Sequence, residues 1–213
     1  MKEIILASVS PRRREIIQNI PLNFTVMPSR YEENLEKCGS ESAHKTKFSR
    51  KTVEKISYCK AKDVASALDS TSRDALVIAA DTMVILESVC LLKPQDFSEA
   101  FSLLKKLSGK THKVITAITL YDVLTKRHMT RSLTTIVEFR ELQDDEIKHY
   151  IEEFKPFDKA GSYGIQDFVD ENSAFAPPER SFVKKIVGDY YNVVGISPKL
   201  LMEMLESINK LLK

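Results

Sequence analysis

The 213-residue sequence predicts an α/β fold built on a mixed β-sheet. Apolar runs typical of buried strands alternate with segments that have the apolar spacing of helices through most of the chain. No repeat of fixed period and no linker rich in proline, glycine and serine divides it. We therefore expect a single domain over residues 1–213, with two lobes as a variant of that architecture.

The first elements are a strand, a helix and a second strand. Residues 4–7 are apolar and rich in β-branched side chains, as in a buried strand. Ser10 and Pro11 then predict a helix start, because serine is a good N-cap and proline fits the first helical position. Residues 21–26 predict a second strand, and residues 28–49 are polar and irregular. The apolar stripe of the helix is Ile16, Ile17 and Ile20.

A second helix and a hairpin follow. Residues 53–68 carry helical apolar spacing, with Val53, Ile56, Ala61, Val64 and Ala65 on one face. The run at residues 75–80 predicts a buried strand that resumes at residues 83–86. A turn at residues 87–88 would lead into its hairpin partner at residues 89–92.

The next segment predicts a helix over residues 94–107 that ends at Ser108 and Gly109. Strands are expected at residues 114–121 and 133–139, joined by a polar stretch.

The last segment predicts a helix at residues 144–154 and a glycine-bearing loop at residues 159–166. An insertion at residues 167–180 and strand-like material at residues 181–194 precede a terminal amphipathic helix at residues 198–212.

The composition excludes several classes of protein. Hydrophobic residues make up 43% and charged residues 29%, which excludes a disordered chain. The net charge of +2 argues against a protein that coats nucleic acid, and no apolar run reaches the ~18–20 residues of a membrane span. Three cysteines without paired spacing favour a reducing compartment, so we expect a cytoplasmic protein.

Three arginines, Arg12, Arg13 and Arg14, open the first predicted helix, where the helix dipole is already positive. Each cation there is unfavourable by up to about 1 kcal/mol. One interpretation is that backbone amides, the Ser10 hydroxyl and the guanidinium groups converge on a bound phosphate. The alternative is a solvated basic turn with Glu15 as partner.

Asp81 interrupts the apolar stretch of residues 75–86, so we expect its carboxylate at a strand end near the core. A buried carboxylate needs a cation, hydrogen bonds or a metal. Open α/β sheets bind ligands at the C-terminal ends of their strands, which favours a functional role. The alternative is an aspartate that caps the following turn.

Four more positions are ambiguous by themselves: Glu33 in the irregular segment, Lys60 on the second helix, Lys93 before a proline, and Gln166 at the end of the glycine-bearing loop. Such acids, lysines and loop glutamines are usually solvated, although the Gln166 amide offers both a donor and an acceptor to a ligand. The six glycines form neither a P-loop nor a Rossmann fingerprint, and the four histidines are scattered. A phosphate-handling site without a P-loop is the interpretation left.

Eight short stretches match, in order, the pattern of a known family. They are residues 6–13, 32–33, 60–61, 80–82, 93–94, 107–112, 158–166 and 188–195. Through them the chain resembles the Maf family of nucleoside triphosphate pyrophosphatases along nearly its whole length. The resemblance implies hydrolysis between the α and β phosphates, and an elongated fold like that of inosine triphosphatases with a cleft between two lobes.

The resemblance also implies roles for individual residues. Asp81 would be the proton acceptor, and Glu33 with Asp81 would hold a divalent cation, Mg²⁺ or Mn²⁺. Arg12, Thr82 and Gln166 match the branch of the family that acts on dTTP and UTP, whereas another branch acts on 7-methyl-GTP. Related proteins suggest a homodimer. The residues implied to line the triphosphate are Ser10, Arg12, Arg13, Lys60 and Lys93.

The sequence departs from the family pattern at Asp167, where a glycine usually follows the glutamine. Residues 36–51 and 168–180 are longer than is typical. Two alternatives to a pyrimidine nucleotide pyrophosphatase therefore stay open: the same reaction on 7-methyl-GTP or another noncanonical nucleotide, and a nucleotide-binding regulator of cell division without turnover.

Overall fold

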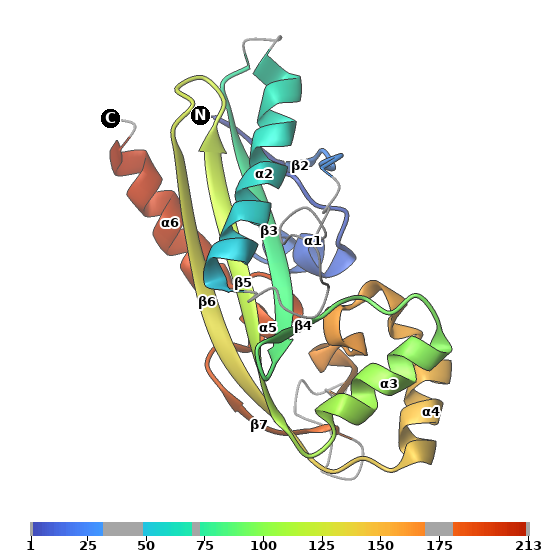
Figure 1. Cartoon of the computed structure of the whole chain (residues 1–213). Helices are drawn as coiled ribbons and strands as arrows, with labels where there is room; N and C mark the ends of the chain where they lie inside the picture. Colours follow the sequence, from blue (N-terminus) through green and yellow to red (C-terminus); the bar gives the residue numbers. More distant parts are fainter. Residues whose placement is uncertain (1, 32–48, 70–72, 169–180, 212–213) are drawn as a thin grey trace. The chain divides into compact units, whose positions relative to one another are not determined.

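The computed structural model describes residues 2–31, 49–69, 73–168 and 181–211 (Figure 1). In these ranges seven strands form a mixed sheet in the order β2-β1-β3-β5-β6-β7, with β4 paired to β3. This confirms the mixed α/β class. The strands are β1 (Glu3–Leu6), β2 (Thr25–Val26), β3 (Ala75–Leu86), β4 (Val89–Leu91), β5 (Thr111–Asp122), β6 (His128–Phe139) and β7 (Val183–Val187). The α-helices are α1 (Pro11–Gln18), α2 (Arg50–Asp69), α3 (Phe97–Leu107), α4 (Asp144–Phe154), α5 (Tyr190–Val194) and α6 (Pro198–Leu211).

The chain divides into two compact units. Unit 1 comprises Met1–Thr82, Thr116–Leu133 and Gly195–Lys213, and unit 2 comprises Met83–Ile115 and Thr134–Val194. Strands β3, β5 and β6 contribute residues to both units, because each of them crosses a boundary in the sequence.

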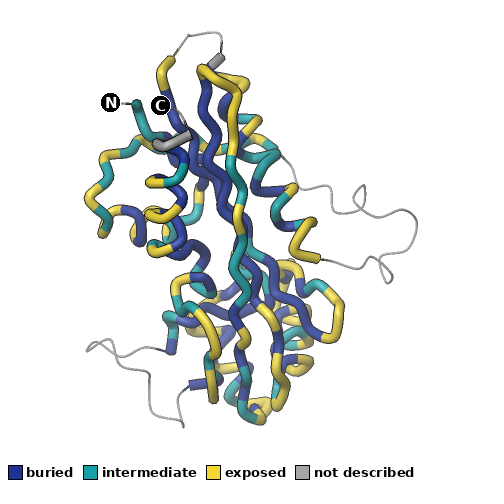
Figure 2. The backbone as a smooth tube through the Cα atoms, turned by 90° about the vertical axis from the view of Figure 1, so that its left-hand side faces the viewer, coloured by how far each residue is buried: buried dark blue, intermediate teal, exposed yellow. Residues whose placement is uncertain are grey.

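Unit 1 is built on parallel strands covered by α2. In β1, Ile5 pairs with Thr25 of β2 and with Val77 of β3. The predicted apolar face of α2 is buried at all five positions, and its Ala61, Val64 and Ala65 pack on alternate residues of β3. Every residue of β3 except Thr82 is buried, and Figure 2 draws the buried parts of the backbone in dark blue.

Unit 2 contains two antiparallel pairs of the sheet. Strand β4 pairs with the end of β3 through the predicted hairpin, and β7 pairs with the end of β6. Helices α3 and α4 contact one another and bury Leu104, Leu107, Ile147 and Ile151 in the core of this unit.

Capping and turn residues in the sequence predicted the bounds of α4 and the end of α3 correctly. Helix α4 has the predicted bounds, and α3 ends at Leu107 before Gly109, whose φ of +67° suits glycine. None of the helices in the described ranges has both the length and the apolarity needed to cross a membrane.

Some of the expected strand bounds were wrong. Strand β3 does not break at residues 81–82 but runs on to Leu86, because both polar side chains find partners while the backbone stays in the ladder. The second strand, predicted at residues 21–26, is confined to Thr25–Val26. The segment at 181–194 does contain the predicted strand material, as β7, and helix α5 follows it.

A buried histidine lies among aromatic rings in unit 2. His112 is 1% exposed, its Nε2 lies 2.8 Å from the Tyr163 hydroxyl, and its ring meets the Phe139 ring edge-on at 5.0 Å. Burial lowers the pKa of His112 to about 4, since the interior disfavours the charged imidazolium. The folded protein therefore holds this ring neutral at pH values where the unfolded chain would protonate it.

We expect stability to fall as the pH drops from about 6.5 to about 4, because the unfolded state binds the His112 proton more readily in that window. The contribution lost by pH 4 is roughly 3 kcal/mol. Urea unfolding at pH 7 and pH 4 measures it: His112→Gln should lose less stability over this interval than the wild type. The same pH dependence in both proteins would contradict the assignment.

Candidate functional site

The first turn of α1 forms as the sequence predicts. Ser10 is the N-cap, its backbone is extended, and its hydroxyl accepts a hydrogen bond from the Arg13 amide at 3.4 Å. Pro11 occupies the first helical position, and no acidic residue lies in this turn. The Ser10 amide in turn donates to the Ser8 hydroxyl at 3.2 Å. The positive end of the helix dipole is thus combined with a positively charged side chain.

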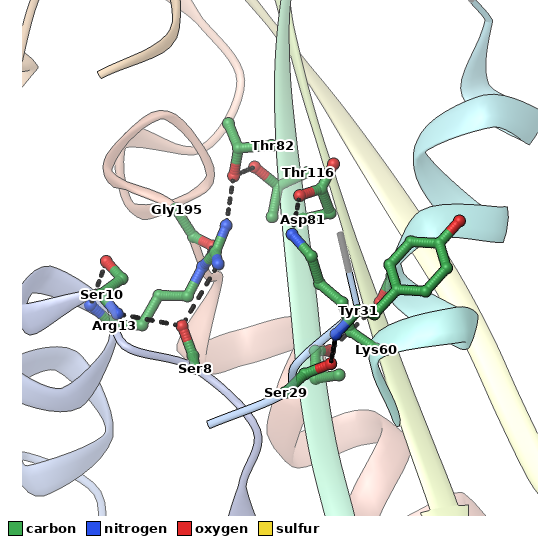
Figure 3. Close-up of polar contacts among 12 residues, drawn as sticks. Ser8, Ser10, Arg13, Ser29, Tyr31, Lys60, Asp81, Thr82, Thr116 and Gly195 are labelled. Carbon is green, nitrogen blue, oxygen red and sulfur yellow. Dashed lines mark hydrogen bonds and ion pairs between the residues drawn. The ribbon is translucent and has the colours of Figure 1, made fainter. Parts of the chain in front are cut away.

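The Arg13 guanidinium is held in a fixed direction by three neutral acceptors (Figure 3). Its Nε donates to the Gly195 carbonyl at 2.9 Å and its Nη2 to the Thr82 hydroxyl at 3.0 Å. Its Nη1 donates to the Ser8 hydroxyl at 3.4 Å. Because all five guanidinium N–H groups can only donate, these oxygens fix its plane without adding negative charge.

Two residues outside the predicted set support this arrangement. The Thr116 hydroxyl on β5 lies 2.9 Å from that of Thr82, so Thr82 can accept from Arg13 and donate its own proton to Thr116. Gly195 has a φ of +136°, and a Cβ there would lie 3.4 Å from the Arg13 Nε. The glycine therefore lets a backbone carbonyl approach the guanidinium closely.

Asp81 forms an ion pair with Lys60 of α2, and their Nζ and Oδ1 atoms are 2.6 Å apart. The Asp81 side chain is 7% exposed and that of Lys60 is 17% exposed. Removing a carboxylate from water costs several kcal/mol unless a partner compensates it, and the Lys60 ammonium supplies that partner. The expectation that Asp81 lies at a strand end was wrong, and so was the alternative that it caps the following turn, because it lies inside a continuous strand.

Asp81 and Thr82 are consecutive, so their side chains leave β3 toward opposite faces. Lys60 meets Asp81 on one face and Arg13 meets Thr82 on the other, as Figure 3 shows. The parallel pairing with β1 extends along β3 only to Ile78, so this part of β3 lies beyond the C-terminal end of β1. Ligands of parallel α/β sheets commonly bind at such strand ends.

The structure thus places five of the predicted residues of unit 1 in two groups: Ser10, Arg13 and Thr82 on one face of β3, and Lys60 with Asp81 on the other. Arg12 lies on α1 and is half-buried. Glu33 lies outside the described residues. Lys93, which is exposed, and Gln166, which is half-buried, belong to unit 2. Sequence reasoning missed the role of Thr116, whose signal is a hydroxyl within an apolar strand.

Gln166 has an unusual local environment in unit 2. It lies in the short 3₁₀ helix η3 (Ile165–Phe168), and its side-chain Oε1 is buried without a hydrogen-bond partner among the described residues. A buried amide oxygen without a donor costs about 1–3 kcal/mol, so such groups call for an explanation. One explanation is that this oxygen is an acceptor for an N–H group of a ligand.

The described residues supply only part of the ligands that a divalent cation needs. Asp81 supplies the hard carboxylate oxygen that Mg²⁺ and Mn²⁺ prefer, while no group of three acids, histidines or cysteines suited to a metal occurs within the described ranges. Mg²⁺ is usually held by one or two carboxylates together with substrate phosphates. The residues therefore fit a cation that is completed by a phosphate ligand better than a fully protein-held metal.

The sequence is similar to known proteins along nearly its whole length. The family model described as "Maf-like protein" matches residues 3–208. The chain is 40% identical over 210 residues to a protein of Ruminiclostridium cellulolyticum named dTTP/UTP pyrophosphatase, covering 99% of this chain and 98% of that protein. Proteins with the same name are 44% identical over 197 residues in Alkaliphilus oremlandii (92% and 91% covered) and 38% identical over 208 residues in Bacillus velezensis (98% and 97% covered).

Gly195→Ala should lower the free energy of unfolding by about 2 kcal/mol, because a residue with a side chain is strained at its φ of +136°. Urea unfolding followed by circular dichroism measures this loss. Gly109→Ala is the control: its φ of +67° is ordinary left-handed backbone and its Cβ would meet the flexible Glu141 side chain, so about 1 kcal/mol is expected. A Gly195→Ala protein as stable as the wild type would show that the backbone at this position is not strained by a side chain.

Proposed function

This chain belongs to the Maf family, and on that premise we propose that it is a nucleoside triphosphate pyrophosphatase that hydrolyses dTTP and UTP. Water is added across the bond between the α-phosphorus and the bridging oxygen to the β-phosphate, which yields the monophosphate and pyrophosphate. The observation that carries the proposal is that two consecutive residues of β3, Asp81 and Thr82, contact the cations Lys60 and Arg13, in a chain whose relatives bear that activity in their names.

The triphosphate is bound by the start of α1 and the neighbouring cations. Its negative charges are favoured at a helix N-terminus, where backbone amides and the Ser10 hydroxyl are available. Arg13 presents a guanidinium whose direction is already fixed by Thr82 and Gly195, so little side-chain entropy is lost on binding. Arg12 is proposed to add charge at the same ligand, and Lys93, which belongs to unit 2, stays a predicted phosphate-binding residue.

Asp81 is proposed to accept the proton from the attacking water. In the structure its carboxylate is compensated by Lys60 at 2.6 Å. Phosphate oxygens of an arriving nucleotide offer the Lys60 ammonium a second anionic partner, so the lysine can serve the ligand and the acid in turn. A carboxylate held this way is placed for general-base catalysis before the substrate arrives.

Asp81, together with Glu33, would hold the divalent cation that enters with the nucleotide. Such a cation stabilises negative charge on the phosphates and on the leaving pyrophosphate. The chain's own residues then account for the rest: Arg13 and Lys60 for binding, and Asp81 for moving the proton.

The base is proposed to be read in unit 2 by Gln166. Uracil and thymine present an N–H donor between two carbonyl acceptors, and an amide side chain offers the complementary acceptor and donor. The partner-free Oε1 suits the ring N–H. A homodimer and a cytoplasmic location stay predictions.

The substrate class is tested by pyrophosphate release from dTTP, UTP, CTP, GTP and 7-methyl-GTP, each with Mg²⁺ or Mn²⁺. We expect dTTP and UTP to be the best substrates, and we expect EDTA to abolish turnover until the cation is added back. If 7-methyl-GTP were turned over fastest, the chain would belong to the branch of the family that acts on that nucleotide. No release from any nucleotide, with binding retained, would favour a regulator.

Asp81→Asn should lower kcat by roughly 10²–10⁴-fold, the usual contribution of a general base. Pyrophosphate release under saturating UTP measures it. Asp122→Asn is a matched control, since Asp122 is also buried in unit 1 and paired with a lysine, Lys2, at 2.9 Å. The control should lose stability and keep its turnover. A loss below tenfold in Asp81→Asn would remove this carboxylate from proton transfer.

A further inference from the structure

A buried tyrosine of α4 holds both ends of the turn that carries Gln166. The Tyr150 hydroxyl accepts a hydrogen bond from the Gly164 amide at 3.0 Å and donates one to Asp167 Oδ2 at 2.6 Å. The Asp167 amide also donates to the Gly164 carbonyl at 3.1 Å. Gly164 and Asp167 are therefore joined to each other directly and through one shared hydroxyl.

The position of this hydroxyl is fixed by packing. The Tyr150 ring is 4% exposed and contacts three phenylalanine rings, with centroid distances of 5.0 Å to Phe154, 5.4 Å to Phe168 and 5.0 Å to Phe182. Burial, helped by the nearby Asp167 charge, raises the pKa of Tyr150 far above that of free tyrosine. The hydroxyl thus keeps its proton and remains a donor to Asp167 throughout the physiological pH range.

The same turn confines the Gln166 side chain. A Cβ on Gly164 would lie 2.6 Å from Gln166 Nε2 and 2.7 Å from Asp167 Oδ2, so both groups lie directly over the glycine backbone. Gln166 Oε1 is buried and has no hydrogen-bond partner among the described residues. An amide that rotated freely would turn this oxygen toward a donor, so its neighbours must hold it in place.

We propose that Tyr150 and Asp167 are specificity-determining positioning residues, which clamp the turn at residues 164–167 so that Gln166 presents its amide oxygen to the ring N–H of a pyrimidine. The inference rests on the proposed function of Gln166 in reading the base.

The clamp is tested first without any activity measurement. Tyr150→Phe removes the acceptor of the Gly164 amide, so hydrogen exchange at Gly164 should become at least about tenfold faster, the effect of losing a bond worth about 1.4 kcal/mol. Tyr163→Phe is the matched control. Its buried hydroxyl contacts His112 rather than the turn backbone, so Gly164 exchange should stay near the wild-type rate. Unchanged exchange at Gly164 in Tyr150→Phe would overturn the clamp.

The specificity role is tested by the ratio of kcat/KM for UTP to that for CTP, because cytosine lacks the ring N–H at this position. Tyr150→Phe and Asp167→Gly should each lower the ratio about tenfold. The double variant should lose no more than Tyr150→Phe alone, since removal of the hydroxyl already breaks the hydrogen bond that Asp167 accepts. Asp167→Asn keeps an oxygen that accepts from Tyr150 and should retain most of the discrimination.

The outcomes separate the two levels of inference. A wild-type protein that does not hydrolyse UTP would refute the proposed function, while Gly164 exchange would still decide whether the clamp exists. An active wild type whose UTP-to-CTP ratio is unchanged in Tyr150→Phe and Asp167→Gly would overturn the positioning role alone.

Discussion

A carboxylate inside a buried strand must have its charge compensated, and the structure of unit 1 around Asp81 follows from that need. The Lys60 ammonium compensates the Asp81 carboxylate at a distance of 2.6 Å. This contact requires α2 to pack on β3 with Lys60 at the level of Asp81. The apolar face of α2, packed on alternate residues of β3, sets that level. Core packing and the placement of the proposed base are therefore one constraint, since shifting the helix along the strand would part the ion pair.

On the opposite face of β3, neutral groups do the positioning. Arg13 is directed by two hydroxyls and a carbonyl, and Thr116 orients the hydroxyl of Thr82 in turn. The two cations thus have different local roles: Lys60 balances an acid, whereas Arg13 is oriented by dipoles at the positive end of a helix. Such a site is prepared for an anion before one binds, because its donors are ordered in advance.

Unit 2 orders an uncharged side chain in a similar way. Three phenylalanine rings fix Tyr150, Tyr150 fixes the turn at residues 164–167, and the turn holds Gln166 with a buried acceptor. The hydrogen-bond partners of Arg13 belong to unit 1 and this aromatic cluster belongs to unit 2, so a substitution in the cluster should leave Arg13 in place.

The sequence by itself determined the α/β class, the Ser10 and Pro11 helix start, the bounds of α4 and the buried face of α2, because capping residues and apolar spacing act over a few neighbouring positions. It also singled out Asp81, Arg13 and Gln166 as candidates. Only the tertiary structure decided their partners. Arg13 and Gly195 are 182 positions apart, and Thr82 and Thr116 are 34 apart, so no local pattern could pair them. Even the passage of β3 through Asp81 depended on distant Lys60, because a carboxylate stays within a buried strand only where folding brings a cation to it.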